Sequence, residues 1–261
     1  MKRIFHATRL FLYSKRNVSS VLEAKKKFQH IAKLVSQLWN EKRYHEAISV
    51  LRENNKGPNM SLFLKEKEAD MLMAIHNYHE AIETYQQVID NTKNMDKNDK
   101  MLIQVRIGQC YFLLGDLEKA RDMFLIAANT DEGDPLPYER LGHMYCQYSS
   151  KVEHKYEMNQ YLDLAIEYFK KALERDPKYS DAHYGLGICY QRREKYEESI
   201  QSFTNVLKGD QKYYAAIFNR ADCEFIIGKY KEAMRDYEIF LDQSYREFID
   251  KLDENGNKVD P

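Results

Sequence analysis

Tyr44-His45-Glu46-Ala47-Ile48 recurs 34 residues later as Tyr78-His79-Glu80-Ala81-Ile82. The same interval relates two further pairs of stretches, which are RIGQCY at 106–111 with RLGHMY at 140–145, and YEESI at 196–200 with YKEAM at 230–234. A fixed period of 20 to 50 residues indicates a chain built from stacked supersecondary units. Since one such unit cannot bury its apolar face alone, neighbours must share a continuous core.

Small and large residues keep fixed places within this period. Position 8 is small in five repeats, at Ala69, Gly108, Gly142, Gly187 and Ala221, whereas the first repeat has Val35. Position 20 is small in all six, at Ala47, Ala81, Ala120, Ala165, Ser199 and Ala233. Position 24 is aromatic in five, at Tyr85, Phe124, Phe169, Phe203 and Tyr237, whereas the first repeat has Leu51. Small residues at 8 and 20 allow two helices to approach closely, and large residues fill the space around them.

On these residues the chain resembles the tetratricopeptide-repeat family, whose 34-residue unit is a helix–turn–helix. The resemblance covers about residues 28–247. It implies an all-α fold, a right-handed α-solenoid of about six helical hairpins with a C-terminal capping helix. We expect the repeats near 28–61, 62–95, 101–134, 135–179, 180–213 and 214–247. Residues 244–252 are expected to form the capping helix, which ends within 248–261, and the last residues are expected to fray.

One long insertion interrupts the period. About eleven extra residues, 148–158, lie inside the fourth repeat, between its two helices. Insertions of this kind map to one rim of a solenoid, which is often a binding rim. The alternative is a tolerated loop extension, because lengthening a surface loop costs little.

The N-terminal residues differ in charge from the rest. Residues 1–27 hold eight Lys/Arg and one Glu, so they carry +7, whereas the remainder carries −8. Residues 1–20 contain no acid and are basic and amphipathic, which is typical of a mitochondrial transit peptide. The alternative is a surface helix or a basic tail. No run of 18 apolar residues occurs, so no transmembrane helix is expected.

In the resembled family, positions 2, 5, 6, 9, 12 and 13 face the concave groove. Position 6 is a cation in four successive repeats, at Lys33, Lys67, Arg106 and Arg140. Such a ladder suits an acidic peptide or a peptide carboxylate, since Lys and Arg make charge-assisted hydrogen bonds. The alternative is a solvated face whose cations pair with Glu66, Asp70 or Glu139. Four aromatic residues join the predicted partner-binding groove, and they are Trp39, Phe112, Tyr184 and Phe218.

Other site chemistries have little support. The family's carboxylate clamp for chaperone tails needs Lys and Asn at set groove positions, and no three successive repeats supply them. Cys110, Cys189 and Cys223 share position 10, which indicates packing, since a buried free Cys behaves as a small hydrophobe. His76 and His79 have ligand spacing but no third ligand nearby. We expect no catalytic residue, metal or cofactor.

The sequence therefore predicts a non-catalytic scaffold that binds other proteins, including acidic or amphipathic segments. Residues 1–27 favour a subunit or assembly factor of a large mitochondrial complex, in the matrix or associated with the inner membrane. One alternative is a cytoplasmic or ciliary adaptor or co-chaperone that docks short peptides. Another is a ribosome- or RNA-associated protein, although the acidic body opposes nucleic acid in the groove.

Overall fold

The computed structural model describes residues 26–54, 62–92 and 94–249, with side chains as far as 243. All regular structure in these residues is α-helical, which confirms the all-α fold class. Residues 26–40 form the first helix. The others are α2 (Tyr44–Asn54), α3 (Leu62–Ala74), α4 (Tyr78–Asn91), α5 (Lys97–Leu113), α6 (Leu117–Thr130), α7 (Leu136–Ser149), α8 (Lys155–Arg175), α9 (Ser180–Arg192), α10 (Tyr196–Gly209), α11 (Tyr214–Ile226) and α12 (Tyr230–Ile249).

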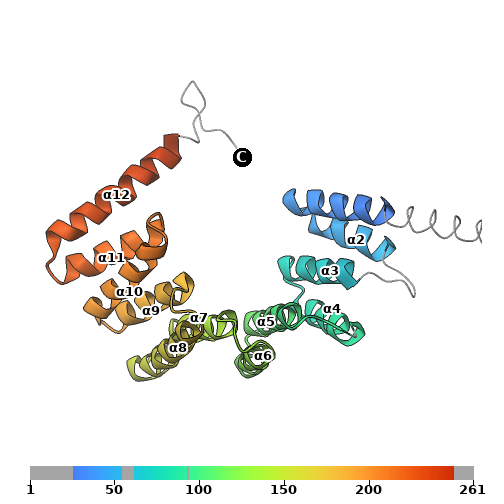
Figure 1. The fold of residues 1–261 in the computed structure, drawn as a ribbon, viewed down its shortest axis with the longest axis horizontal. Coiled ribbons are helices and arrows are strands. Elements are labelled where there is room, and N and C mark those ends of the chain that lie inside the picture. The colour runs from blue at the N-terminus through green and yellow to red at the C-terminus, as the bar shows by residue number, and fades with distance from the viewer. Residues whose placement is uncertain (1–25, 55–61, 93, 250–261) are drawn as a thin grey trace, which may run out of the picture. The chain divides into compact units, whose positions relative to one another are not determined.

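The helices follow one another as hairpins joined by short turns (Figure 1). The chain divides into two compact units, of which the first ends at Ala120 and the second begins at Arg121. In the first unit α3 packs against α2 and α4, and in the second α9 packs against α7, α8 and α10. None of the described helices is both long enough and apolar enough to cross a membrane.

Five hairpins close with the same turn. Its central residue has a positive φ and lies at Lys42, His76, Gly115, Glu194 and Gly228. In the second repeat the amide of His76 donates to the Met73 carbonyl at 3.1 Å, and the amide of Asn77 donates to the Leu72 carbonyl at 2.9 Å. This pair of hydrogen bonds is the Schellman motif, which satisfies the last carbonyls of a helix. The repeat therefore fixes the turn strongly enough that three non-glycine residues adopt the left-handed conformation.

The core confirms why small residues recur. Phe169 of α8 lies between Gly142 of α7 and Gly185 of α9, and a Cβ added at Gly142 would lie 2.7 Å from the Phe169 ring. In the next repeat a Cβ at Gly187 would lie 2.5 Å from the Phe203 ring. Such distances are well inside carbon–carbon contact, so only glycine permits this approach.

The fourth-repeat insertion is mostly helix. Helix α8 has 21 residues, whereas α4, α6 and α10 have 14 each, so the extra residues lengthen it at its N-terminal end. Residues at the end of α9 and in the turn after it contact the residues at both ends of the insertion. Arg192 donates to Ser150 Oγ at 2.6 Å, and Arg193 donates to the Asn159 carbonyl at 3.4 Å. Lys155 pairs with Glu194 at 3.0 Å.

The C-terminal cap differs from the expectation of a separate helix. Residues 244–249 continue α12, which runs unbroken from Tyr230 to Ile249. The reason is local, because no Gly or Pro interrupts this stretch and nothing else in it stops a helix. The expected fraying beyond 249 and the expected basic segment before 26 lie outside the described residues.

Candidate functional site

The first compact unit contains a hollow of about 410 Å³ that is lined by three helices. The first helix contributes Val35 and Trp39, α3 contributes Lys67, Asp70 and Met71, and α5 contributes Arg106. Three of the residues predicted from the sequence, Trp39, Lys67 and Arg106, thus line one hollow. Lys33 lies exposed on the first helix and Phe112 lies half-buried near the end of α5.

A buried carboxylate organises the polar side of this hollow. Asp70 has a side chain only 8% exposed, and its Oδ1 accepts a hydrogen bond of 2.6 Å from the hydroxyl of Tyr85. Lys67 Nζ lies 2.9 Å from Asp70 Oδ2, and Arg106 pairs with Asp70 Oδ1. A carboxylate that is taken out of water needs such donors, because an unpaired buried charge is costly.

The network spreads beyond the hollow. Burial raises the pKa of the Tyr85 hydroxyl, and the negative charge of Asp70 raises it further, so Tyr85 keeps its proton at neutral pH and donates it to Asp70. Burial and repulsion from Asp70 also raise the pKa of Glu66. Lys67 and Arg106 are therefore not free cations, because they share the carboxylate of Asp70, and Glu66 lies close to the same charges.

The apolar side of the hollow is built around Trp39. Its side chain is 40% exposed and meets the Tyr44 ring edge-on, with the ring centroids 5.2 Å apart. Val35 and Met71 are buried and form the floor beside it. An exposed indole over an apolar floor is the kind of surface that anchors a partner side chain.

The fourth repeat, in the second unit, pairs its cation differently. Glu139 is 2% exposed and lies 2.9 Å from His143 Nε2 through its Oε1. Arg140 Nε lies 3.3 Å from Glu139 Oε2, an ion-pair contact that lacks hydrogen-bond geometry. Arg140 thus has a carboxylate partner on its own helix, as the solvated-face alternative expects.

Tyr184 and Phe218 are the remaining predicted residues of the second unit, and both contact other side chains of that unit. Tyr184 accepts a hydrogen bond of 3.0 Å from Asn219 Nδ2 and lies against the Tyr213 ring. Phe218 packs on Phe240 with the ring centroids 4.9 Å apart. These contacts make both aromatic side chains part of the α9–α12 packing as well as of the surface.

Sequence reasoning missed Tyr85 as a component of the site. The signal was present, because position 24 is Tyr in the second and sixth repeats and Phe in the third, fourth and fifth. Where it is Tyr, an Asp occurs 15 residues earlier, and the hydroxyl donates to it at 2.6 Å both in Tyr85–Asp70 and in Tyr237–Asp222. A tyrosine at position 24, where other repeats have phenylalanine, therefore indicates that the groove residue 15 positions earlier accepts a hydrogen bond from the tyrosine hydroxyl.

The cysteine and histidine candidates have structural surroundings, and Cys146 and Cys189 belong to one core cluster. All four cysteines are buried, and burial raises the pKa of the Cys110 thiol to about 12, which makes that thiol unreactive. His76 Nδ1 lies 2.6 Å from the Tyr78 hydroxyl. Across the part of the chain that the structure describes, no three His, Cys, Asp or Glu residues are grouped closely enough to hold a metal ion.

The fold and its grooves define a helical-repeat protein whose surfaces are suited to binding other polypeptides. Models of the tetratricopeptide repeat match residues 67–135, 156–179, 168–201 and 190–244. The chain belongs to the tetratricopeptide-repeat family, and proteins of this kind are scaffolds for protein–protein interaction. The first repeat, near 28–61, lies outside the matched residues, in keeping with its atypical Val35 and Leu51.

Solved structures support the same fold. The C-terminal part of a repeat-containing protein from Cytophaga hutchinsonii is 18% identical with a TM-score of 0.58, over 83% of this chain and 80% of that one. A tetratricopeptide-repeat protein from Parabacteroides merdae is 20% identical with a TM-score of 0.57, over 82% and 78%. A thermophilic one from Thermus thermophilus is 17% identical with a TM-score of 0.54, over 70% and 91%. A comparison with curated proteins found no significant match.

Proposed function

We propose that the protein is a non-catalytic scaffold whose first compact unit binds a polypeptide segment in the hollow beside Trp39. The segment would place an apolar side chain against Trp39, Val35 and Met71. It would place a carboxylate next to Lys67. The observation that carries the proposal is an exposed indole and a half-exposed ammonium in one hollow with an apolar floor.

Lys67 is better suited than Arg106 to meet the ligand. Arg106 holds Asp70 and lies 3.5 Å from the Tyr85 hydroxyl, so removing it from that network would leave a buried carboxylate poorly paired. Lys67 is held by Asp70 at 2.9 Å and lies 5.6 Å from the Phe63 ring centroid, at the surface of α3. Its flexible stem lets the ammonium turn toward a second carboxylate without unfolding the helix.

Affinity purification of the full chain followed by mass spectrometry tests this proposal. Trp39→Ala and Lys67→Ala should each remove the same partners from the wild-type set. Phe225→Ala is the matched control, since Phe225 occupies position 12 of the sixth repeat as Trp39 does in the first, and is 56% exposed. Recovery of an unchanged partner set with both variants of the first unit would reject the hollow as the binding site.

The finer proposal is that this scaffold is a subunit or assembly factor of a large mitochondrial complex. Its support is the basic, acid-poor composition of residues 1–27. A fusion of residues 1–30 to a fluorescent protein should enter mitochondria, and the same fusion with Arg9 and Arg16 changed to Glu should not. A diffuse cytosolic signal from the unchanged fusion would favour the cytoplasmic or ciliary adaptor. Sedimentation of the full chain with ribosomes would favour ribosome association.

A further inference from the structure

A second surface, in the other compact unit, has the features of a docking groove. A hollow of about 440 Å³ lies among α8, α9 and α10. Leu173, Leu186 and Tyr190 give it an apolar floor, and Leu186 is itself buried. Glu197 and Glu198, both exposed in the first turn of α10, line one side of it. This part of the surface is therefore apolar in the middle and acidic on one side.

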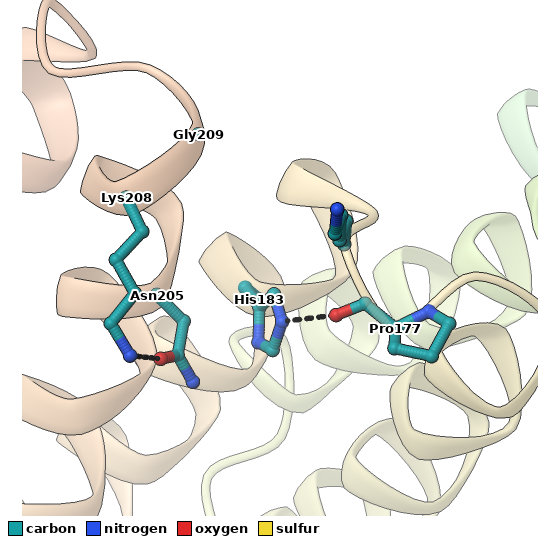
Figure 2. Close-up of a pocket in the computed structure, with 6 residues that line it drawn as sticks. Pro177, His183, Asn205, Lys208 and Gly209 are labelled. Atoms are coloured by element: carbon teal, nitrogen blue, oxygen red, sulfur yellow. Dashed lines mark hydrogen bonds between the residues drawn. The ribbon is translucent and has the colours of Figure 1, made fainter.

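A neighbouring hollow of about 500 Å³ has the opposite charge (Figure 2). Pro177 and Lys178 of the α8–α9 turn line it, together with Lys208 and Gly209 at the end of α10. No acidic side chain is among the residues that line it. The nearby Asp176 has its Oδ1 engaged by the backbone amide of Lys178 at 2.9 Å.

His183 and Asn205 line both hollows, so the two adjoin. Figure 2 shows His183 between the Pro177 side and the Asn205–Lys208 side, and His183 Nε2 donates to the Pro177 carbonyl at 3.0 Å. Asn205 Oδ1 accepts from Lys208 Nζ at 2.8 Å and from Gln201 Nε2 at 3.3 Å. Because its oxygen is engaged, Asn205 offers its amide hydrogens to a ligand, and the basic hollow presents mainly hydrogen-bond donors.

The hydrogen bonds within the groove leave its four charged side chains exposed to a ligand. Ser202 is buried, and its hydroxyl donates to the Glu198 carbonyl at 2.8 Å, so it adds no unpaired donor to the apolar floor. Lys178 and Lys208 are exposed, as are Glu197 and Glu198. The groove thus runs from an acidic end, over Leu186, to a basic end.

We propose that this groove of α8, α9 and α10 docks an extended polypeptide segment with charges of opposite sign at its two ends. Basic side chains of the segment would lie at Glu197 and Glu198. An apolar side chain would lie over Leu173, Leu186 and Tyr190. Acidic side chains would lie at Lys178 and Lys208. Complementary potentials of this kind select partners and fix their register.

The spacing sets the length of the segment. Glu198 and Lys208 are ten residues apart on α10, which corresponds to roughly 15 Å at the rise of an α-helix. An extended chain covers that distance in about four to five residues. A nucleic acid is excluded as the occupant, because its phosphates would meet two carboxylates at the acidic end.

Fluorescence anisotropy with defined peptides on the full chain tests the proposal. The probes are fluorescein-labelled Asp-Asp-Ala-Leu-Ala-Arg-Arg, the reverse order Arg-Arg-Ala-Leu-Ala-Asp-Asp, and the shuffled Asp-Arg-Ala-Leu-Ala-Asp-Arg. One of the two ordered peptides should bind at least about tenfold more tightly than the shuffled peptide, since only an ordered peptide meets both ends at once. Equal binding of all three peptides would overturn the proposal.

Variants locate the binding. The double variants K178Q/K208Q and E197Q/E198Q should each remove the preference for the ordered peptide. Replacing both Asp by Asn in the peptide should weaken binding to the wild type, and should change little further in K178Q/K208Q. All four protein residues are exposed, so the melting temperature should be unchanged. Trp39→Ala should leave this binding intact, which separates the groove from the hollow of the first unit. A preference that survives both double variants, or that Trp39→Ala abolishes, would place the peptide elsewhere and overturn the assignment.

Discussion

Tyr85 and Tyr237 occupy the same position of their repeats, and each hydroxyl donates to an Asp 15 residues earlier at 2.6 Å. Their surroundings differ. Asp70, which accepts from Tyr85, is buried and also pairs with Arg106 of α5, the first helix of the following repeat. Asp222, which accepts from Tyr237, is half-buried and belongs to the last repeat of the described residues. The charge of each groove position therefore depends on the next repeat as well as on its own.

The fourth and fifth repeats extend the comparison, because their position-24 aromatics are Phe169 and Phe203. These rings carry no hydroxyl, and glycines rather than carboxylates fix them in place. Phe169 meets His143 edge-on at position 9, with the centroids 5.2 Å apart. The aromatic residue at position 24 is thus held in two ways. A tyrosine donates its hydroxyl to a groove carboxylate, whereas a phenylalanine packs closely against glycines and makes no such hydrogen bond.

Asp70→Ala should have the largest effect on stability. It removes the shared partner of Arg106, Lys67 and the buried Tyr85 hydroxyl, so the free energy of unfolding should fall by about 3–5 kcal/mol. Asp222→Ala is the matched change at the half-buried site and should cost about 1 kcal/mol. Urea denaturation followed by circular dichroism measures both. Equal losses would show that the next repeat contributes nothing to the difference.

Gly185→Ala tests the close packing of phenylalanine against glycines. The added methyl would overlap the Phe169 ring, which is also confined by Gly142 on its other side. Overpacking of this kind should lower the free energy of unfolding by about 2 kcal/mol, even though alanine favours the helix. Gly133→Ala is the control, because a Cβ there would meet only Asp131 Oδ1 at 3.6 Å. A Gly185→Ala variant as stable as this control, in the same urea titration, would contradict the packing of Phe169.

The sequence was sufficient to predict the repeat, its small positions and the helical fold. As the alternative to a ladder of free cations it named Glu66, Asp70 or Glu139 as partners, and Lys67 and Asp70 are three residues apart on one helix face. It did not show that Asp70 is buried or that Arg106 reaches it across 36 residues. A repeat pattern assigns each residue to a face, but contact between repeats depends on side-chain rotamers that the pattern does not contain.

The same limit explains the other differences. The insertion was expected between two helices, but the sequence did not show that part of it extends the N-terminal end of α8. Arg192 and Arg193 of the next repeat donate hydrogen bonds to Ser150 and Asn159 there, and the repeat pattern does not contain these contacts. The groove of α8, α9 and α10 joins residues from three helices at positions outside those that the family pattern assigns to the concave groove. Charge reversal of Arg106 would therefore be a poor test of the cation ladder, because it would leave Asp70 buried beside a like charge.

Tyr85→Phe and Tyr237→Phe compare the two hydroxyls directly. Loss of a buried hydrogen bond to a carboxylate should cost about 2 kcal/mol for Tyr85. Tyr237 is half-buried, so water can replace its hydroxyl, and the cost should be about 0.5 kcal/mol. The difference in urea midpoint at constant m-value gives both numbers. A larger loss for Tyr237 than for Tyr85 would reverse the interpretation of the two sites.

Glu224→Gln should give the smallest effect, and its sign depends on pH. Glu224 is buried in the last repeat, and its Oε2 has no hydrogen-bond partner among the described residues. Burial and the nearby Asp236 and Glu232 raise the pKa of Glu224, against the lowering effect of Arg220 and Lys229. The folded state therefore holds this proton more tightly than the unfolded state, so the contribution of Glu224 to stability falls as pH rises from 4.5 through the folded pKa.

Glutamine keeps the shape of the protonated acid but does not ionise. Glu224→Gln should therefore be about 0.5–1 kcal/mol more stable than the wild type at pH 7, and about as stable at pH 3.5, where the wild-type side chain is protonated. Thermal unfolding at the two pH values measures the difference, and the exposed Glu232→Gln serves as the control for the change in net charge. If the gain is the same at both pH values, the effect comes from packing alone. A loss of stability at pH 7 would show that Arg220 already compensates the carboxylate, and that the last repeat supplies its own cation where the second repeat takes one from its successor.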